Sequence, residues 1–145
     1  MKTKASLDDV EQAITEATLT LRAEFLEAVP VLTSAELSAR SSGISASSES
    51  VREWCRSRRI FSVHDRGQEL YPAFQFGEDG QPHAIVAEIL AILDRDPERT
   101  EWDNALWFAS DTGWLDGQRP IDCLLSDPSA VRLDAEQEVL RDSAA

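Results

Sequence analysis

The chain has 145 residues, enough for one ordinary domain or two very small ones. Hydrophobic residues make up 42% of it, so it can bury a core. No apolar run approaches the ~20 residues that span a bilayer, and none of signal-peptide type follows the N-terminal lysines, so we expect a cytoplasmic protein with no membrane contact. The net charge of −13, taken as an average, argues against nucleic-acid binding.

Residues 6–28 have the pattern of a helix, which Ser6 can cap and Pro30 ends. Its apolar residues recur at spacings of three and four: Leu7, Val10, Ile14, Ala17 and Leu21. This face can pack on the rest of the chain. Because the spacing follows a heptad for two repeats, it can also form the seam of a homodimer. We therefore assign residues 1–30 to packing or dimerisation.

Residues 33–59 are predicted to form two short helices separated by a turn at Gly43, since glycine adopts left-handed backbone readily. In the second helix the apolar positions i, i+3 and i+4 would face inward: Val51, Trp54 and Cys55. This is the pattern of a helix-turn-helix, in which the second helix lies in the major groove of DNA.

The charge distribution agrees with that interpretation. Residues 31–76 carry six basic and five acidic side chains, net +1, whereas residues 77–145 carry five basic and sixteen acidic ones, net −11. Serines at a helix N-terminus and arginines along its outer face can bind phosphates, and arginine also reads guanine edges. The alternative is that the arginines are a solvated helix face. The predicted DNA contacts are Ser47, Ser48, Arg52, Arg56, Arg58, Arg59 and Arg66.

Residues 60–76 are predicted to form a β-hairpin, because β-favouring residues flank the glycine-containing turn Asp65-Arg66-Gly67. A hairpin directly after a recognition helix is a wing, whose tip would bring His64 and Arg66 near the DNA backbone or minor groove. Residues 31–76 are thus predicted to be a DNA-binding helix-turn-helix plus wing. The polar loop 77–82, with two glycines and a proline, is the predicted domain boundary.

The C-terminal half is predicted to be helical. The apolar residues of 83–94 indicate a helix buried on more than one side. A second helix opens near Thr100, a short one begins at Pro120, and a last one runs from Ala130 to about Val139. The predicted fold class is therefore mainly α with one small β-hairpin: an N-terminal helix, a winged helix-turn-helix-like module and a C-terminal helical bundle domain at 83–140.

Candidate catalytic chemistry is absent from the pattern. Cys55 and Cys123 lie far apart, without cysteine or histidine neighbours at metal-ligand spacing, and are expected to be buried or half-buried thiols. The chain shows no nucleophile–base pairing and no glycine-rich phosphate loop. We therefore expect a non-enzyme with no catalytic residue, no metal and no cofactor.

The stretch Leu115–Val131, preceded by Trp107-Phe108, resembles the toxin-binding domain of the Xre/MbcA/ParS antitoxins. The shared pattern is an aromatic-bearing helix, a leucine with a nearby glycine, a proline-started helix ending in leucine, and a last helix opening near a valine. The resemblance covers roughly residues 83–140. The N-terminal part departs from the family's usual helical Xre-type module, being nearer the MerR or excisionase style.

The resemblance implies a cognate toxin as partner, most often a RES-domain toxin that consumes NAD, together with homodimerisation and repression of the protein's own operon through double-stranded operator DNA. An acidic domain would be attracted to the cationic pockets of such a toxin. Aromatic residues dominate binding hot spots, and Trp114 in a loop is the better exposed anchor, whereas Trp107 fits the core. The predicted toxin contacts are Trp114, Leu115, Gln118, Arg119 and Pro120.

Two other functions fit the same sequence. A stand-alone DNA-binding transcriptional regulator, whose C-terminal domain only dimerises, predicts an operator but no neighbouring toxin. A protein-interaction module, whose arginine face binds an acidic protein, predicts no salt-dependent DNA binding.

Overall fold

The computed structural model describes residues 7–40 and 48–144 of the chain. It is mainly helical with a small antiparallel sheet, which confirms the predicted fold class. In chain order the elements are α1 (Leu7–Ala28), β1 (Val31–Leu32), α2 (Ser34–Arg40), α3 (Ser48–Arg56), β2 (Val63–Asp65), β3 (Gln68–Pro72), the 3-10 turn η1 (Ala73–Gln75), α4 (Ala84–Leu93), α5 (Glu101–Phe108), the 3-10 turn η2 (Gly113–Leu115), α6 (Pro120–Cys123) and α7 (Pro128–Ala144). The predicted cap Ser6 and the predicted turn at Gly43 lie outside the described residues.

The sheet confirms the predicted hairpin and adds a strand. β2 pairs with β3 in antiparallel register, with Val63 opposite Leu70. The two-residue turn between them has positive φ at Arg66 (53°) and Gly67 (76°), the backbone that matches the twist of a hairpin. β1 pairs with the other edge of β3, giving the strand order β1-β3-β2. Two helices followed by a hairpin, with a short first strand on the hairpin's edge, is the order of elements expected of a helix-turn-helix plus wing.

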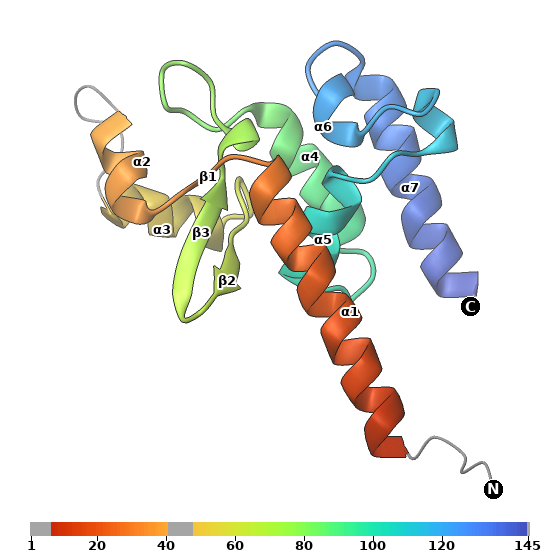
Figure 1. The fold of residues 1–145 in the computed structure, drawn as a ribbon. Coiled ribbons are helices and arrows are strands. Elements are labelled where there is room, and N and C mark those ends of the chain that lie inside the picture. The colour runs from red at the N-terminus through yellow and green to blue at the C-terminus, as the bar shows by residue number, and fades with distance from the viewer. Residues whose placement is uncertain (1–6, 41–47, 145) are drawn as a thin grey trace, which may run out of the picture.

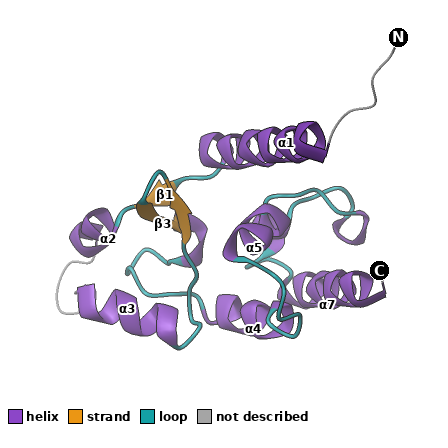
Figure 2. Ribbon diagram, turned by 90° about the horizontal axis from the view of Figure 1, so that it is seen from below, coloured by secondary structure: helices purple, strands orange, loops and turns teal. Residues whose placement is uncertain are grey.

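The buried apolar side chains form two clusters. Figure 2 shows α2 and α3 apart from α4, α5 and α7, with the strands β1 and β3 beside α2 and α3. The smaller cluster joins α2, α3 and the sheet and consists of Leu37, Val51, Trp54, Ile60, Tyr71 and Phe76. The larger cluster lies among α4, α5, α6 and α7 and also takes Phe61 and Val63 from the start of the hairpin. The core of the helical bundle therefore includes hairpin residues that precede the loop 77–82 in the sequence.

Helix α1 packs on the rest of the chain at its C-terminal end only. Its C-terminal end packs on α5, where the rings of Phe25 and Trp102 meet edge to face with centroids 5.7 Å apart. Its N-terminal part extends beyond the rest of the molecule (Figure 1). There the heptad residues Val10, Ile14 and Leu21 are exposed. Packing on the same chain thus uses only the last turns of the helix.

One buried side chain connects the two clusters. The Gln75 amide is fully buried, and its Oε1 accepts the Phe61 N–H at 2.8 Å. Its Nε2 donates to the carbonyl oxygens of Phe61 at 2.9 Å and Pro72 at 3.1 Å. Buried backbone groups need such partners because an unpaired one loses its water without replacement. Gln75 therefore fastens the chain at the point where it passes from one cluster to the other.

We expect Gln75→Leu to lower the free energy of unfolding by about 3 kcal/mol, because it leaves buried N–H and C=O groups unpaired at similar side-chain volume. Chemical denaturation followed by tryptophan fluorescence measures this. The exposed Gln12→Leu is the matched control and should change stability by less than about 0.5 kcal/mol. Equal free energies of unfolding for the two variants would show that the hydrogen bonds of Gln75 contribute nothing to stability.

Candidate functional site

The first candidate surface is the outer face of α3. Val51 and Trp54 are buried against α2 and the sheet, so the residues between them point outward. Arg52 and Arg56, as well as Arg59 just after the helix, are exposed. The structure thus brings three of the predicted DNA contacts together on one side of the module.

The same face also carries two carboxylates that the sequence interpretation left out. Glu49 and Glu53 are exposed beside the arginines, and Arg56 pairs with Glu53 at 2.7 Å. The Arg59 guanidinium lies 5.9 Å from the centre of the Trp54 ring, at the outer limit of a cation–π contact. The face is therefore mixed in charge, with a small excess of arginine.

Arg58 occupies a different environment. It lies two residues after α3 with a φ of 58°, and the Arg59 N–H donates to the Trp54 carbonyl oxygen at 2.8 Å, as in a Schellman cap. Its guanidinium binds Asp94 through two hydrogen bonds of 3.0 and 2.8 Å and Glu101 through two of 2.8 and 3.2 Å. These bonds, first those to Asp94, raise the pKa of Arg58. Arg58 therefore connects α3 to α4 and α5 and is not available to phosphate in this arrangement.

The remaining predicted DNA contacts lie elsewhere. Arg66 is exposed at the tip of the β2–β3 hairpin. The hairpin is held against the helical bundle, because the Trp102 indole donates to the His64 carbonyl oxygen at 3.0 Å. Ser48 is the first residue of α3, and Ser47 lies outside the described residues.

The second candidate surface is the segment from η2 to α6. Trp114 is 58% exposed, as its place in a loop predicts, and Gln118 is exposed too. Arg119 is held by Asp122 through hydrogen bonds of 3.0 and 2.9 Å, which orient its guanidinium at the surface. By contrast, Leu115 and Pro120 are buried. These two side chains shape the loop from below, so direct contacts of this segment would be made by the other three.

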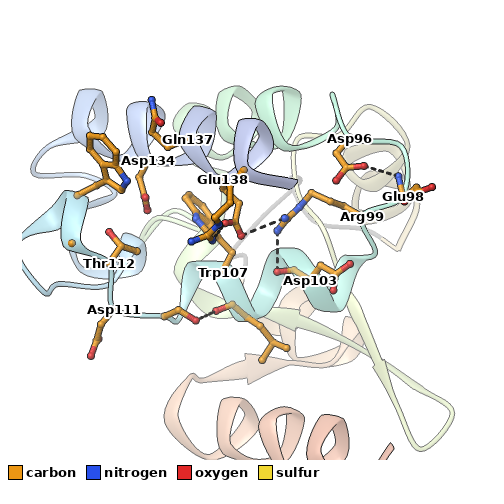
Figure 3. A pocket seen from close by; sticks show the side chains of 15 residues that line it. Asp96, Glu98, Arg99, Asp103, Trp107, Asp111, Thr112, Asp134, Gln137 and Glu138 are labelled. Carbon is orange, nitrogen blue, oxygen red and sulfur yellow. Dashed lines mark hydrogen bonds and ion pairs between the residues drawn. The ribbon is translucent and has the colours of Figure 1, made fainter. Parts of the chain in front are cut away.

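A cleft of about 800 Å³ lies between α5, η2 and α7, with Trp107 in its wall (Figure 3). Two arginines line it, Arg99 and Arg141. Six carboxylates line it as well: Asp96, Glu98, Asp103, Asp111, Asp134 and Glu138. We refer to it below as the acidic cleft. The sequence analysis did not predict this cleft, because its lining residues, from Asp96 to Arg141, are up to 45 positions apart in the chain.

Among the described residues, neither the cysteines nor the potential metal ligands form a further candidate site. Cys55 is a half-buried and Cys123 a buried free thiol, as predicted. Burial, with the negative charges of Glu69 and Glu101, raises the pKa of Cys55 to about 11, so the thiol stays protonated at neutral pH. Among residues 7–40 and 48–144, no group of His, Cys, Asp or Glu side chains is arranged to hold a metal ion. No helix in that part of the chain has the length and hydropathy needed to cross a bilayer.

No protein-family model, curated protein or solved structure matches this chain.

We expect Arg58→Ala to lower the free energy of unfolding by about 2 kcal/mol, because it removes the half-exposed ion pairs with Asp94 and Glu101 while a residue with a Cβ remains at the same positive φ. Arg58→Gly should cost about 1 kcal/mol less, since glycine adopts this backbone freely. Urea denaturation measures both. Arg56→Ala, which breaks one exposed pair, is the control and should cost less than about 0.5 kcal/mol. A similar loss for all three variants would contradict the bridging role of Arg58.

Proposed function

We propose that this chain is the antitoxin of a type II toxin–antitoxin system, which neutralises a cognate toxin, of the NAD-consuming RES type, and represses its own operon. The observation that carries the proposal is the stretch Leu115–Val131, which resembles the toxin-binding domain of the Xre/MbcA/ParS antitoxins. Trp114, directly before this stretch, is exposed, and within the stretch Gln118 is exposed and the Arg119 guanidinium is oriented by Asp122. An aromatic anchor with polar neighbours is the usual composition of an interface hot spot.

The acidic character of the C-terminal half supports a basic partner. Residues 77–145 have a net charge of −11, from sixteen acidic and five basic side chains. A protein that binds an anionic dinucleotide needs a cationic pocket, and an acidic surface would accelerate association with it.

DNA binding is proposed for the other end of the molecule. Arg52, Arg56 and Arg59 share the outer face of α3, and Arg66 stands at the wing tip. Glu49 and Glu53 on the same face reduce its attraction for phosphate. One copy of this surface is therefore expected to bind DNA weakly, so that a dimer reading two half-sites is needed for specific binding.

The exposed part of α1 fits such a dimer. Val10, Ile14 and Leu21 follow heptad spacing and are not covered by the rest of the chain. A second copy of the same helix offers the same spacing, and a two-fold pairing would bury both faces at once.

Co-expression with the product of the adjacent gene tests the antitoxin function. We expect a stable complex by pull-down and size-exclusion chromatography, and recovery of growth from the neighbour's toxicity. Trp114→Ala should weaken the complex by about tenfold or more, as for a hot-spot residue. Leu19→Ala is a matched control, since Leu19 is 56% exposed on α1 and lies off the heptad seam. Binding of promoter DNA without any complex would favour the stand-alone regulator instead.

Fluorescence anisotropy with DNA from upstream of the gene tests the DNA surface. We expect the logarithm of the binding constant to fall linearly with the logarithm of salt concentration, and the slope to decrease by about one for each of Arg52→Gln, Arg56→Gln and Arg59→Gln. Arg95→Gln is the control. Arg95 belongs to the C-terminal half of the chain, is exposed, and makes one long ion pair of 4.0 Å with Glu136. Binding that is insensitive to salt would support the interaction-module alternative.

A further inference from the structure

The end of the acidic cleft nearest Thr112, which we call its inner end, contains a buried carboxylate with one oxygen that has no hydrogen bond of regular geometry among the described residues. Asp134 of α7 is 4% exposed, and Figure 3 shows it pointing toward Thr112 across the cleft. Among the described residues, neither Asp134 Oδ2 nor Thr112 Oγ1 has a hydrogen bond of regular geometry. An unpaired buried carboxylate costs free energy, and native proteins rarely retain one unless it is paired in the bound state.

The surroundings of Asp134 are anionic. Burial raises the pKa of its carboxyl group, Glu138 one turn along α7 raises it further, and the nearby Thr112 hydroxyl and Arg141 act in the opposite direction. Arg141 does not neutralise Asp134 directly, because its guanidinium is hydrogen-bonded to Glu138. A cation that entered the cleft would therefore find a carboxylate that, among the described residues, only the Thr112 hydroxyl approaches.

The other end of the cleft already holds a guanidinium. Arg99 is 7% exposed at its side chain, and its Nε donates to Asn104 Oδ1 at 2.9 Å. One terminal nitrogen donates to the Asp103 carbonyl oxygen at 3.1 Å, and the other lies 3.4 Å from Glu138 Oε2. The walls of this cleft thus provide the planar set of oxygen acceptors that a guanidinium requires.

From these observations we propose that the inner end of the acidic cleft binds a second guanidinium, the side chain of an arginine that the toxin inserts beside Trp114, with Asp134 and Thr112 as acceptors. That the arginine belongs to a toxin rests on the proposed antitoxin function. The cleft volume of about 800 Å³ admits an arginine side chain with its flanking backbone.

Guanidinium fits the site better than the other ions that a protein partner could offer. Six carboxylates against two arginines exclude an anion. A lysine ammonium is a strongly hydrated point charge, whereas guanidinium is planar and weakly hydrated, so it loses less on entering a partly buried cleft. It also stacks on an aromatic ring, and Trp107 and Trp114 both line the cleft.

The experiment titrates the full chain with acetyl-arginine amide while the indole N–H signals are followed by NMR, with the Trp114 signal assigned from Trp114→Phe. We expect a saturable shift of this signal in the millimolar range. Acetyl-citrulline amide, which has nearly the same shape and no charge, should shift it little, and acetyl-lysine amide should bind more weakly than the arginine amide.

Asp134→Asn should weaken arginine binding by about tenfold, since it replaces a charge-assisted hydrogen bond by a neutral one. The variant should fold with an equal or higher thermal midpoint, because a buried unpaired charge is removed. Glu78→Gln in the loop 77–82 lowers the charge by the same amount away from the cleft and should bind arginine like the wild type. An equal response to arginine and citrulline, or equal binding by the two variants, would overturn the guanidinium site.

The same two variants are then tested for the complex with the product of the adjacent gene. Loss of affinity by about tenfold in Asp134→Asn, with Glu78→Gln unaffected, supports the toxin arginine. A complex of wild-type affinity in Asp134→Asn overturns this inference and leaves the antitoxin function in place. Specific arginine binding without any complex retains the guanidinium site and overturns the toxin as its source.

Discussion

The hydrogen bonds between Gln75 and Phe61 are the constraint on which the arrangement of the two halves depends. Ile60 belongs to the small cluster under α3, and the next residue, Phe61, belongs to the core of the helical bundle. Consecutive residues of an extended chain point to opposite sides, so one peptide unit serves both cores. Phe61 is fully buried, and the Gln75 amide pairs with both its backbone N–H and its backbone C=O, which belong to two successive peptide units. The position of α3 relative to the bundle follows from this contact and from the ion pairs of Arg58 with Asp94 and Glu101.

This arrangement distributes the charge of the molecule in a way that its average conceals. Four exposed arginines lie in the N-terminal half, three on the outer face of α3 and one at the wing tip. The carboxylates gather in the C-terminal half, where six of them line the cleft between α5 and α7. A molecule with two such surfaces can meet an anionic and a cationic partner at once, because charges separated by more than about 10 Å are largely screened from each other at physiological salt. Two partners of opposite charge are what a repressing antitoxin needs.

Asp134 stands apart from the rest of the interior. Asn104, Gln75 and Arg99 are buried polar side chains whose hydrogen bonds are made within the chain. Asp134 is equally buried, on a helix that otherwise presents Val131, Ala135 and Val139 to the core. A carboxylate at such a position lowers the free energy of unfolding, and proteins keep such destabilising residues mainly at functional sites. The guanidinium proposal gives this cost a physical reason.

The sequence alone determined the elements whose pattern is local. The apolar residues of α4, the capping threonine of α5, the proline that starts α6 and the glycine-containing turn at Gly67 each act on neighbours within a few positions, so the expected helices and hairpin were confirmed. The strand β1 could not be predicted, because two residues are too few to show alternation. The roles of Gln75, Arg58 and Asp134 were decided by the tertiary structure. The partner of Gln75 lies 14 positions away, and the partners of Arg58 lie 36 and 43 positions away. For Asp134 the informative fact is that its Oδ2 has no hydrogen bond of regular geometry among the described residues. Propensity and periodicity describe what a residue does to its own segment, whereas only folding brings distant polar groups together and removes the water that would otherwise satisfy them.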